Sequence, residues 1–189
     1  MVWKLITADS LPSMPWKNGA GTTRELLKFP ASATIDTFDW RISLAAVATS
    51  GPFSLFPDID RTMIVTDGQG IELDGIVLRR TDDPFAFPGE FPYRASLIDG
   101  PIADLNVMTR RTRFSHLVRR HRAVGTSIAR GNIRVIVALS DRAICAIGTE
   151  SITLRRLDSL FVEGAERADV EAADWLEIEI QPAPSAAAT

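Results

Sequence analysis

The chain has 189 residues, 46% of them hydrophobic and 24% charged, a composition typical of a globular protein with one large domain or two small fused domains. Its 21 Lys and Arg residues against 24 Asp and Glu residues give a formal net charge of −3. This balance argues against general binding to nucleic acids or to membrane surfaces, although it says nothing about local patches.

Cysteine usage and the N-terminal sequence both favour a cytoplasmic protein. Cys145 is the only cysteine, so no internal disulfide can form and an oxidising compartment is not required. The N-terminus lacks a basic segment followed by a long apolar run, and no apolar stretch reaches the roughly 20 residues that span a bilayer. We therefore expect a soluble protein without a targeting segment.

Glycine and proline punctuate the chain at short intervals, and many of the segments between them alternate apolar and polar residues, as strands do. Many short strands separated by turns such as Asp74-Gly75 predict an all-β sandwich or barrel. The C-terminal residues 182–189 have nothing to pack and are predicted to be frayed. In chain order, the predicted strands cover residues 3–7, 22–28, 38–47, 62–66, 70–79, 92–98, 104–111, 114–122, 126–129, 133–138, 142–147, 151–156, 159–162 and 175–180.

A repeat appears when the sequence is compared with itself. Ile76–Phe85 matches Ile152–Phe161 at six positions, including the pairs Arg79-Arg80 and Arg155-Arg156, and Glu90 then lies over Glu166. An apolar hairpin precedes each copy, and an Asp followed by an apolar strand comes after it. This shared order indicates two related all-β units with a continuous core.

Charge is unevenly distributed in the second half of the chain. Residues 105–140 contain eight arginines and no acid, whereas residues 158–179 contain eight acids and one base, Arg167. The basic run could form a nucleic-acid patch, but a basic strand that faces its acidic complement within the fold is the simpler interpretation. We expect the second and no binding of nucleic acid, because a nucleic-acid site needs an uncompensated field.

Two strands are predicted to carry the candidate site. In Asp39–Ala45, alternation places Arg41 and Ser43 on the face opposite Trp40, Ile42 and Leu44, and the loop that follows ends on Arg61. In Asp104–Arg110, it groups Asn106, Met108 and Arg110 on one face. Brought together in a barrel, these faces would line a mostly apolar pocket with a few polar groups.

Arginine suggests the ligand of such a pocket. Its planar guanidinium binds a carboxylate through two hydrogen bonds, so a small organic acid is the natural ligand. The alternative is that these arginines form structural pairs with Asp39, Asp60 or Asp104.

A glycine-rich string, Pro15–Glu25, precedes the first of these strands. It has neither a Gly-Lys-Ser/Thr sequence nor a helix after it, so a phosphate loop is not favoured. Lys17 and Asn18 are predicted at the rim of the cavity, with a solvated surface position of Lys17 as the equal alternative.

Metal and nucleophilic chemistry find little support. His116 and His121 are the only histidines and lie in an arginine-rich run, so we expect neither a metal site nor a cofactor. Apolar neighbours make Cys145 an inert buried thiol, and no Gly-x-Ser-x-Gly string is present. No catalytic residue is identified, and Glu25, Glu72 and Glu90 remain the candidates for an acid or base.

Several strings resemble the HutD/Ves family, in the right order and most specifically over the first 115 residues: Met14-Pro15-Trp16-Lys17-Asn18-Gly19-x-Gly21-Thr22-Thr23-Arg24-Glu25, Phe38-Asp39-Trp40-Arg41-Ile42-Ser43, Gly51-Pro52-Phe53-Ser54-x-Phe56-Pro57-x-Ile59-Asp60-Arg61, Pro84-Phe85-x-Phe87-Pro88-Gly89-Glu90 and Asp104-Leu105-Asn106-Val107-Met108-Thr109-Arg110-Arg111. The resemblance implies an all-β, RmlC-like cupin fold (a double-stranded β-helix), duplicated as a bicupin in one chain. The first half, with the ligand pocket, would cover residues 1–112 and the second 113–181, with strands exchanged between them, before a disordered tail at 182–189.

The resemblance also frames the function. The HutD branch is associated with histidine utilisation and the Ves branch with stress responses. We hypothesise a metal-independent regulatory protein of histidine or other amino-acid catabolism that binds a small acid similar to N-formylglutamate or urocanate. The pocket would contain Arg41, Ser43, Arg61, Asn106, Met108 and Arg110, with Lys17, Asn18, Trp40 and Phe53 around its mouth, and Arg61 or Arg41 would bind the carboxylate.

Two other hypotheses stay open. The protein could be a cupin-type isomerase or hydrolase that acts on a small acid through one of the three glutamates. It could also be a protein-interaction module that forms a homodimer through an exposed strand.

Overall fold

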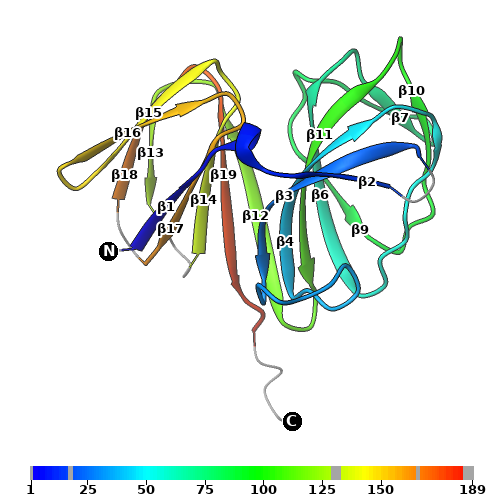
Figure 1. Cartoon of the computed structure of the whole chain (residues 1–189), viewed down its shortest axis with the longest axis horizontal. Coiled ribbons are helices and arrows are strands. Elements are labelled where there is room, and N and C mark those ends of the chain that lie inside the picture. The colour runs from blue at the N-terminus through cyan, green and yellow to red at the C-terminus, as the bar shows by residue number, and fades with distance from the viewer. Residues whose placement is uncertain (1, 17–18, 129–132, 165–166, 185–189) are drawn as a thin grey trace.

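The computed structural model describes residues 2–16, 19–128, 133–164 and 167–184. These residues form strands β1 to β19 and one 3-10 helix, η1 (Ala8–Ser10), with no α-helix among them. No helix in the described part of the chain has the length and apolar character that crossing a membrane requires. The strands build four sheets, arranged as two pairs that lie side by side (Figure 1).

The first pair of sheets is the N-terminal unit. Its six-stranded sheet has the order β2-β3-β4-β11-β6-β9, and its four-stranded sheet has the order β5-β10-β7-β8. The strands are β2 (Ser13–Pro15), β3 (Gly21–Phe29), β4 (Trp40–Val47), β5 (Gly51–Pro52), β6 (Ile59–Asp67), β7 (Ile71–Leu73), β8 (Ile76–Leu78), β9 (Phe85–Pro88), β10 (Arg94–Leu97) and β11 (Ile102–Arg110).

The second pair of sheets is the C-terminal unit. It contains a five-stranded sheet, β1-β17-β14-β19-β12, and a four-stranded sheet, β13-β18-β15-β16. The first strand of the chain belongs here, because β1 pairs with β17. The strands are β1 (Val2–Ile6), β12 (Phe114–His121), β13 (Gly125–Ile128), β14 (Ile133–Ala138), β15 (Arg142–Ile147), β16 (Glu150–Arg155), β17 (Ser159–Glu163), β18 (Arg167–Glu171) and β19 (Trp175–Pro182).

The two larger sheets pack against each other through a shared apolar core. From the N-terminal unit, this core takes residues such as Ile42 and Val107, and from the C-terminal unit residues such as Val135 and Ile178, all fully buried. Burial of such side chains is the main stabilising contribution to folding. Each unit has a further core between its own two sheets. The face of β4 that bears Trp40, Ile42 and Leu44 therefore packs on the C-terminal unit, and the opposite face points into the N-terminal unit.

The predicted elements agree with the structure in most places and differ in four short strands. Strands β2, β5, β9 and β18 were not predicted, and the strand expected over residues 70–79 is the hairpin β7–β8, which turns at Asp74 (φ 46°) and Gly75 (φ 90°). The start of the segment expected to be frayed is paired, because β19 continues to Pro182 and the Ala183 N–H donates to the Arg113 carbonyl at 2.8 Å.

The predicted contact between the basic and the acidic run is confirmed. β12 pairs with β19 in antiparallel register, which sets Arg119 opposite Glu177. The Arg119 guanidinium binds the carboxylates of both Glu177 and Glu179, and Arg120 binds Asp174. The arginines of β12 are therefore largely neutralised within the fold.

Both copies of the sequence repeat form the same turn. The backbone N–H of Arg79 donates to Asp82 Oδ2 at 2.8 Å, and that of Arg155 donates to Asp158 Oδ2 at 2.9 Å. In each copy the Asp N–H also donates back to the Arg carbonyl at 3.0 Å. The order β4-β11-β6-β9 matches β12-β19-β14-β17, and β5-β10-β7-β8 matches β13-β18-β15-β16.

Candidate functional site

The sheet register brings the predicted polar residues of β4, β11 and β6 into adjacent rows. Met108 lies between Arg41 on one side and Arg61 on the other, and the next row sets Asn106 opposite Ser43. All five residues are buried. The strand parity predicted from alternation is therefore confirmed: these side chains lie on the face that points into the N-terminal unit.

Arg61 is at the centre of this arrangement. Its guanidinium carbon lies 5.0 Å from the centre of the Phe87 ring and 5.3 Å from those of Phe53 and Phe56. One terminal nitrogen donates to Asn106 Oδ1 at 2.8 Å and the other to the Ser54 carbonyl at 3.3 Å. Its Nε has no hydrogen-bond partner in the described part of the chain. Arg61 is thus a buried cation that keeps an unused donor.

A buried carboxylate completes the polar centre. Asp104 Oδ1 accepts a hydrogen bond from the Asn106 amide, so Asn106 bridges Asp104 and Arg61. Burial raises the pKa of Asp104 to about 7, although the charge of Arg61 opposes the rise. Burial likewise lowers the pKa of Arg61 to about 10. Both charged forms are therefore disfavoured by their surroundings, and the carboxyl releases its proton near neutral pH.

Arg41 has a structural partner that was not among the three predicted acids. Its Nε donates to Glu25 Oε2 at 3.0 Å, and Lys28 binds the other oxygen of Glu25 at 3.1 Å. Glu25 and Lys28 are both on β3, the neighbour of β4. The sequence carried a signal for this contact, since Glu25 stands in a predicted strand, but the pairing of β3 with β4 was needed to locate it.

Two of the predicted residues do not line the site. Trp40 was placed at the mouth of the pocket, which is wrong: alternation turns it to the opposite face of β4, where it is buried in the core between the units and stacks on Phe29 at 6.0 Å. Arg110 lies at the end of β11, where it donates to the carbonyls of Asp36 and Phe38 and lies 4.0 Å from Asp39. For Arg110, the structural alternative with Asp39 is the one observed.

The remaining predicted residues lie as follows. Phe53 is half-buried and covers Arg61, and Met108 packs with Phe38 and Ile59 beside it. Lys17 and Asn18 fall outside the described residues, so their predicted place at the rim stays a prediction. Among the other glutamates, Glu90 binds Arg111 at the surface. Only Glu25 is joined directly to the site.

The two histidines each contact other side chains of the fold. Both ring nitrogens of His116 are hydrogen-bonded, to the Thr62 hydroxyl at 2.8 Å and the Thr109 hydroxyl at 2.7 Å, while His121 stacks on Trp175 with ring centres 4.0 Å apart. Within the described ranges no group of three or more His, Cys, Asp or Glu side chains could hold a metal ion.

Gly89 fixes the loop that covers Arg61. The Gly89 carbonyl accepts a hydrogen bond from the Phe56 N–H at 2.8 Å, and the Gly89 N–H donates to the Ile59 carbonyl at 2.7 Å. A Cβ atom at Gly89 would lie 2.7 Å and 2.8 Å from the two carbonyl oxygens of Phe56 and Ile59. Only glycine permits this approach.

We expect Gly89→Ala to lower the free energy of unfolding by about 2 kcal/mol, because the added methyl group must push two backbone segments apart. Urea denaturation measures the loss. Gly51→Ala is the matched control, since a Cβ atom there meets nothing within 4 Å and the change should cost less than about 1 kcal/mol. Equal losses in the two variants would contradict the tight approach at Gly89.

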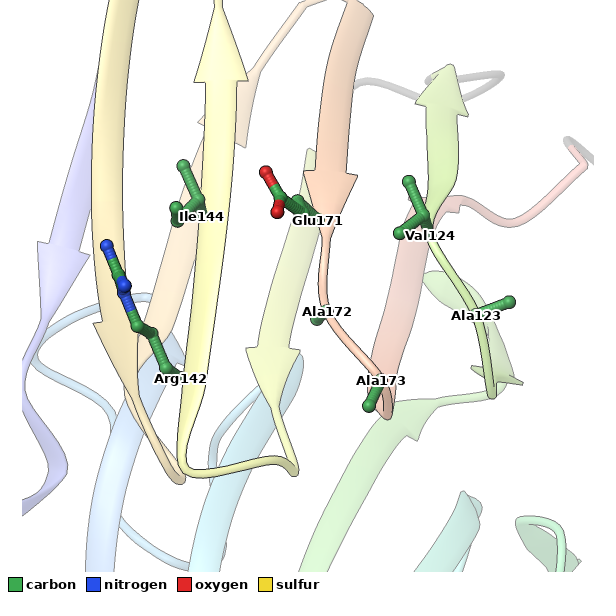
Figure 2. A pocket seen from close by; sticks show the side chains of 7 residues that line it. All are labelled: Ala123, Val124, Arg142, Ile144, Glu171, Ala172 and Ala173. Atoms are coloured by element: carbon green, nitrogen blue, oxygen red, sulfur yellow. The ribbon is translucent and has the colours of Figure 1, made fainter.

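A surface pocket of about 440 Å³ lies away from these residues, on the C-terminal unit. Figure 2 shows Arg142 and Ile144 on β15, Glu171 at the end of β18, and Ala123, Val124, Ala172 and Ala173 on the connecting segments. Small apolar side chains form most of its wall. None of the predicted site residues contributes to it, so it is not the site predicted from the sequence.

The architecture is that of a cupin-like, all-β protein. Protein Ylba from E. coli superposes with a TM-score of 0.64 over 95% of this chain and 90% of its own, at 11% identity, which shows a common fold and no more. The HutD family model matches residues 8–178, and the chain belongs to the HutD family.

Two relatives place the chain more closely. Protein Ves from Cronobacter sakazakii is 40% identical over 134 residues, which cover 68% of this chain and 72% of the relative. The structure of HutD from Pseudomonas fluorescens SBW25, solved in a formate condition, superposes with a TM-score of 0.84 at 27% identity, over 97% of this chain and all of the other. The resemblance to the HutD/Ves family noted from the sequence is confirmed.

Proposed function

We propose that the protein binds a small carboxylate metabolite in the N-terminal unit, without a metal, and thereby regulates or senses the flux of histidine or other amino-acid catabolism. The observation that carries this proposal is the buried Arg61 guanidinium, which keeps a free Nε donor beside Asn106 and under three phenyl rings. A buried cation with unused hydrogen-bonding capacity favours an anion, and the guanidinium geometry favours a carboxylate.

The surroundings of Arg61 support an organic acid over an inorganic anion. Phe53, Phe56 and Phe87 provide an apolar wall suited to the carbon skeleton of a metabolite. Asp104, with its raised pKa, can take up a proton when a second carboxylate arrives, which removes the repulsion between the two.

We also infer that the chain is a bicupin whose two halves arose by duplication. The shared strand order and the identical Arg–Asp turns support this inference. We propose the boundary near residue 112, between β11 and β12, and the pairing of β1 with β17 supports an exchange of β1 into the second half. In the second half, β12 and β19 correspond to β4 and β11. There Arg119 of β12 is already paired with Glu177 and Glu179 of β19, so we assign the ligand to the first half.

Thermal unfolding with a panel of acids tests the proposal. We expect N-formylglutamate, urocanate or formate at millimolar concentration to raise the unfolding temperature of the protein by several degrees, because a ligand that binds only the folded state stabilises it. If no acid of the panel does so, the proposed function is wrong.

A substitution then links the effect to Arg61. We expect Arg61→Lys to weaken binding of the stabilising acid at least tenfold, because lysine keeps the charge but loses the planar pair of donors. Calorimetric titration of the folded variant measures this. Arg113→Lys is the control, because its exposed side chain binds Asp39 away from Arg61. Equal affinity of Arg61→Lys and wild type for the acid would show that Arg61 does not bind the ligand.

One observation favours an enzyme as the second candidate. Glu25 is bound to Arg41 at the edge of the site, where its carboxylate could act as a base toward a bound acid. NMR spectra of the stabilising acid with the protein at high concentration test this. Conversion that Glu25→Gln abolishes would support an enzyme, and an unchanged ligand after several days would remove that candidate.

A further inference from the structure

The two copies of the duplicated Arg-Arg motif lie close to each other where the two units join. Arg80 from the first copy and Arg156 from the second copy occupy the same position of the repeat. Both line one small cavity, together with Val65, Thr66, Arg120, Leu139 and Asp174. Neither the structural core nor the proposed ligand site explains why two equivalent arginines converge there.

The cavity has the size of a single water molecule or a small ion. Its volume is about 10 Å³, close to that of one water-sized sphere. Thr66 lines it with only 2% of its surface exposed, and the Thr66 hydroxyl has no hydrogen-bond partner within the described residues. An unpaired buried hydroxyl costs free energy, so a bound partner in the cavity is expected.

The charges around the cavity identify that partner. Asp174 is the one acid in its wall, and both carboxylate oxygens already accept hydrogen bonds from Arg120, at 2.9 and 2.5 Å. The third nitrogen of Arg120 donates to the carbonyls of Arg80 and Asp82. The charges of Arg120 and Asp174 cancel each other. Among the residues that line the cavity, this leaves the positive charges of Arg80 and Arg156.

Few of the donors on these two arginines are used. Arg156 is half-buried and donates one hydrogen bond, to the Thr66 carbonyl, while Arg80 is exposed to solvent and its guanidinium has no hydrogen bond or ion pair in the part of the chain that the structure describes. The neighbouring carboxylates of Asp82 and Asp158 accept from backbone N–H groups of their own turns. Like charges that converge on one space repel each other, and an anion between them turns the repulsion into attraction.

We propose that this cavity binds one small monovalent anion of halide size, held by the guanidiniums of Arg80 and Arg156 and by the Thr66 hydroxyl. The anion would join the turn after β8 to the turn after β16, and so fasten the N-terminal unit to the C-terminal unit. This site is separate from the one around Arg61, and the proposed function does not depend on it.

Anion exchange in solution tests the proposal. At constant ionic strength, replacing sodium methanesulfonate, which carries no carboxylate, by up to 100 mM sodium bromide should raise the unfolding temperature of wild type by about 3 °C, and the rise should level off at high bromide concentration. Arg80→Gln and Arg156→Gln should remove this rise. Arg79→Gln and Arg155→Gln are matched controls, because they carry the same charge change on the adjacent residue, outside the cavity, and should keep it.

Crystals grown in bromide provide a readout that does not depend on stability. We expect an anomalous peak between Arg80 and Arg156 in wild type and none in Arg80→Gln. A water molecule without an anomalous signal, or a bromide-induced rise that all four variants share, would overturn the proposal. If no carboxylate binds at Arg61 but the bromide peak is present, the proposed function is wrong and the anion site still stands.

Discussion

Replacing Arg120 with methionine is expected to lower the free energy of unfolding by about 2–4 kcal/mol, because the change removes one partner of an ion pair in which Arg120 is buried and Asp174 is 25% exposed. The side chain of Arg120 is only 5% exposed, and two of its nitrogens bind Asp174. Its third nitrogen crosses to the N-terminal unit and donates to the carbonyls of Arg80 and Asp82 at 2.6 and 2.7 Å. After the substitution, the Asp174 charge and both carbonyls lose their partner.

Arg122→Met is the control for this prediction. Arg122 also crosses between the units, to the Thr81 carbonyl and the Asp83 carboxylate, but its side chain is 50% exposed and that of Asp83 is 74% exposed. Exposed pairs contribute little, so we expect a loss below about 1 kcal/mol. Chemical denaturation of both variants measures the difference. A loss in Arg120→Met no larger than that in Arg122→Met would show that Arg120 does not join the units.

Period-two alternation explains why part of the site could be predicted from the sequence. Arg41 and Ser43 had to lie opposite Trp40 and Ile42 on any regular strand, and the structure keeps that arrangement. The same rule shows why Trp40 could not also stand at the mouth of the pocket. Alternation assigns a face to each residue, but it does not say which strands are neighbours.

Long-range pairing accounts for most of what was missed. Arg41, Met108 and Arg61 form one row only because β11 lies between β4 and β6. The contact of Glu25 with Arg41 and the burial of Asp104 follow from the same pairing and were not predicted. The overlooked strands β2, β5, β9 and β18 have two to five residues each and contain proline or acidic residues, which weakens their local signal.

Two buried titratable groups are expected to oppose each other in the dependence of stability on pH. Burial lowers the pKa of His116 from 6.5 to about 4. Below pH 6.5 the unfolded chain therefore binds a proton at this histidine, whereas the folded protein binds it only near pH 4. This contribution to stability is lost as the pH falls from 6.5 to 4. Burial raises the pKa of Asp104 from 3.8 to about 7, so the folded protein takes up a proton first. That contribution is gained as the pH falls from 7 to 3.8.

The single variants should therefore show opposite slopes. Between about pH 5 and 6 the two contributions largely cancel in wild type, because each slope lies somewhat below the limit of about 1.4 kcal/mol per pH unit for one proton. In His116→Gln only Asp104 remains, and the free energy of unfolding should rise as the pH falls. In Asp104→Asn only His116 remains, and it should fall with the same slope. Urea denaturation at half-unit pH steps measures both, and the double variant supplies the background from all other groups. Slopes of the same sign after this subtraction would contradict the burial of one of the two groups, because a buried acid and a buried base with no other difference must respond to protons in opposite directions.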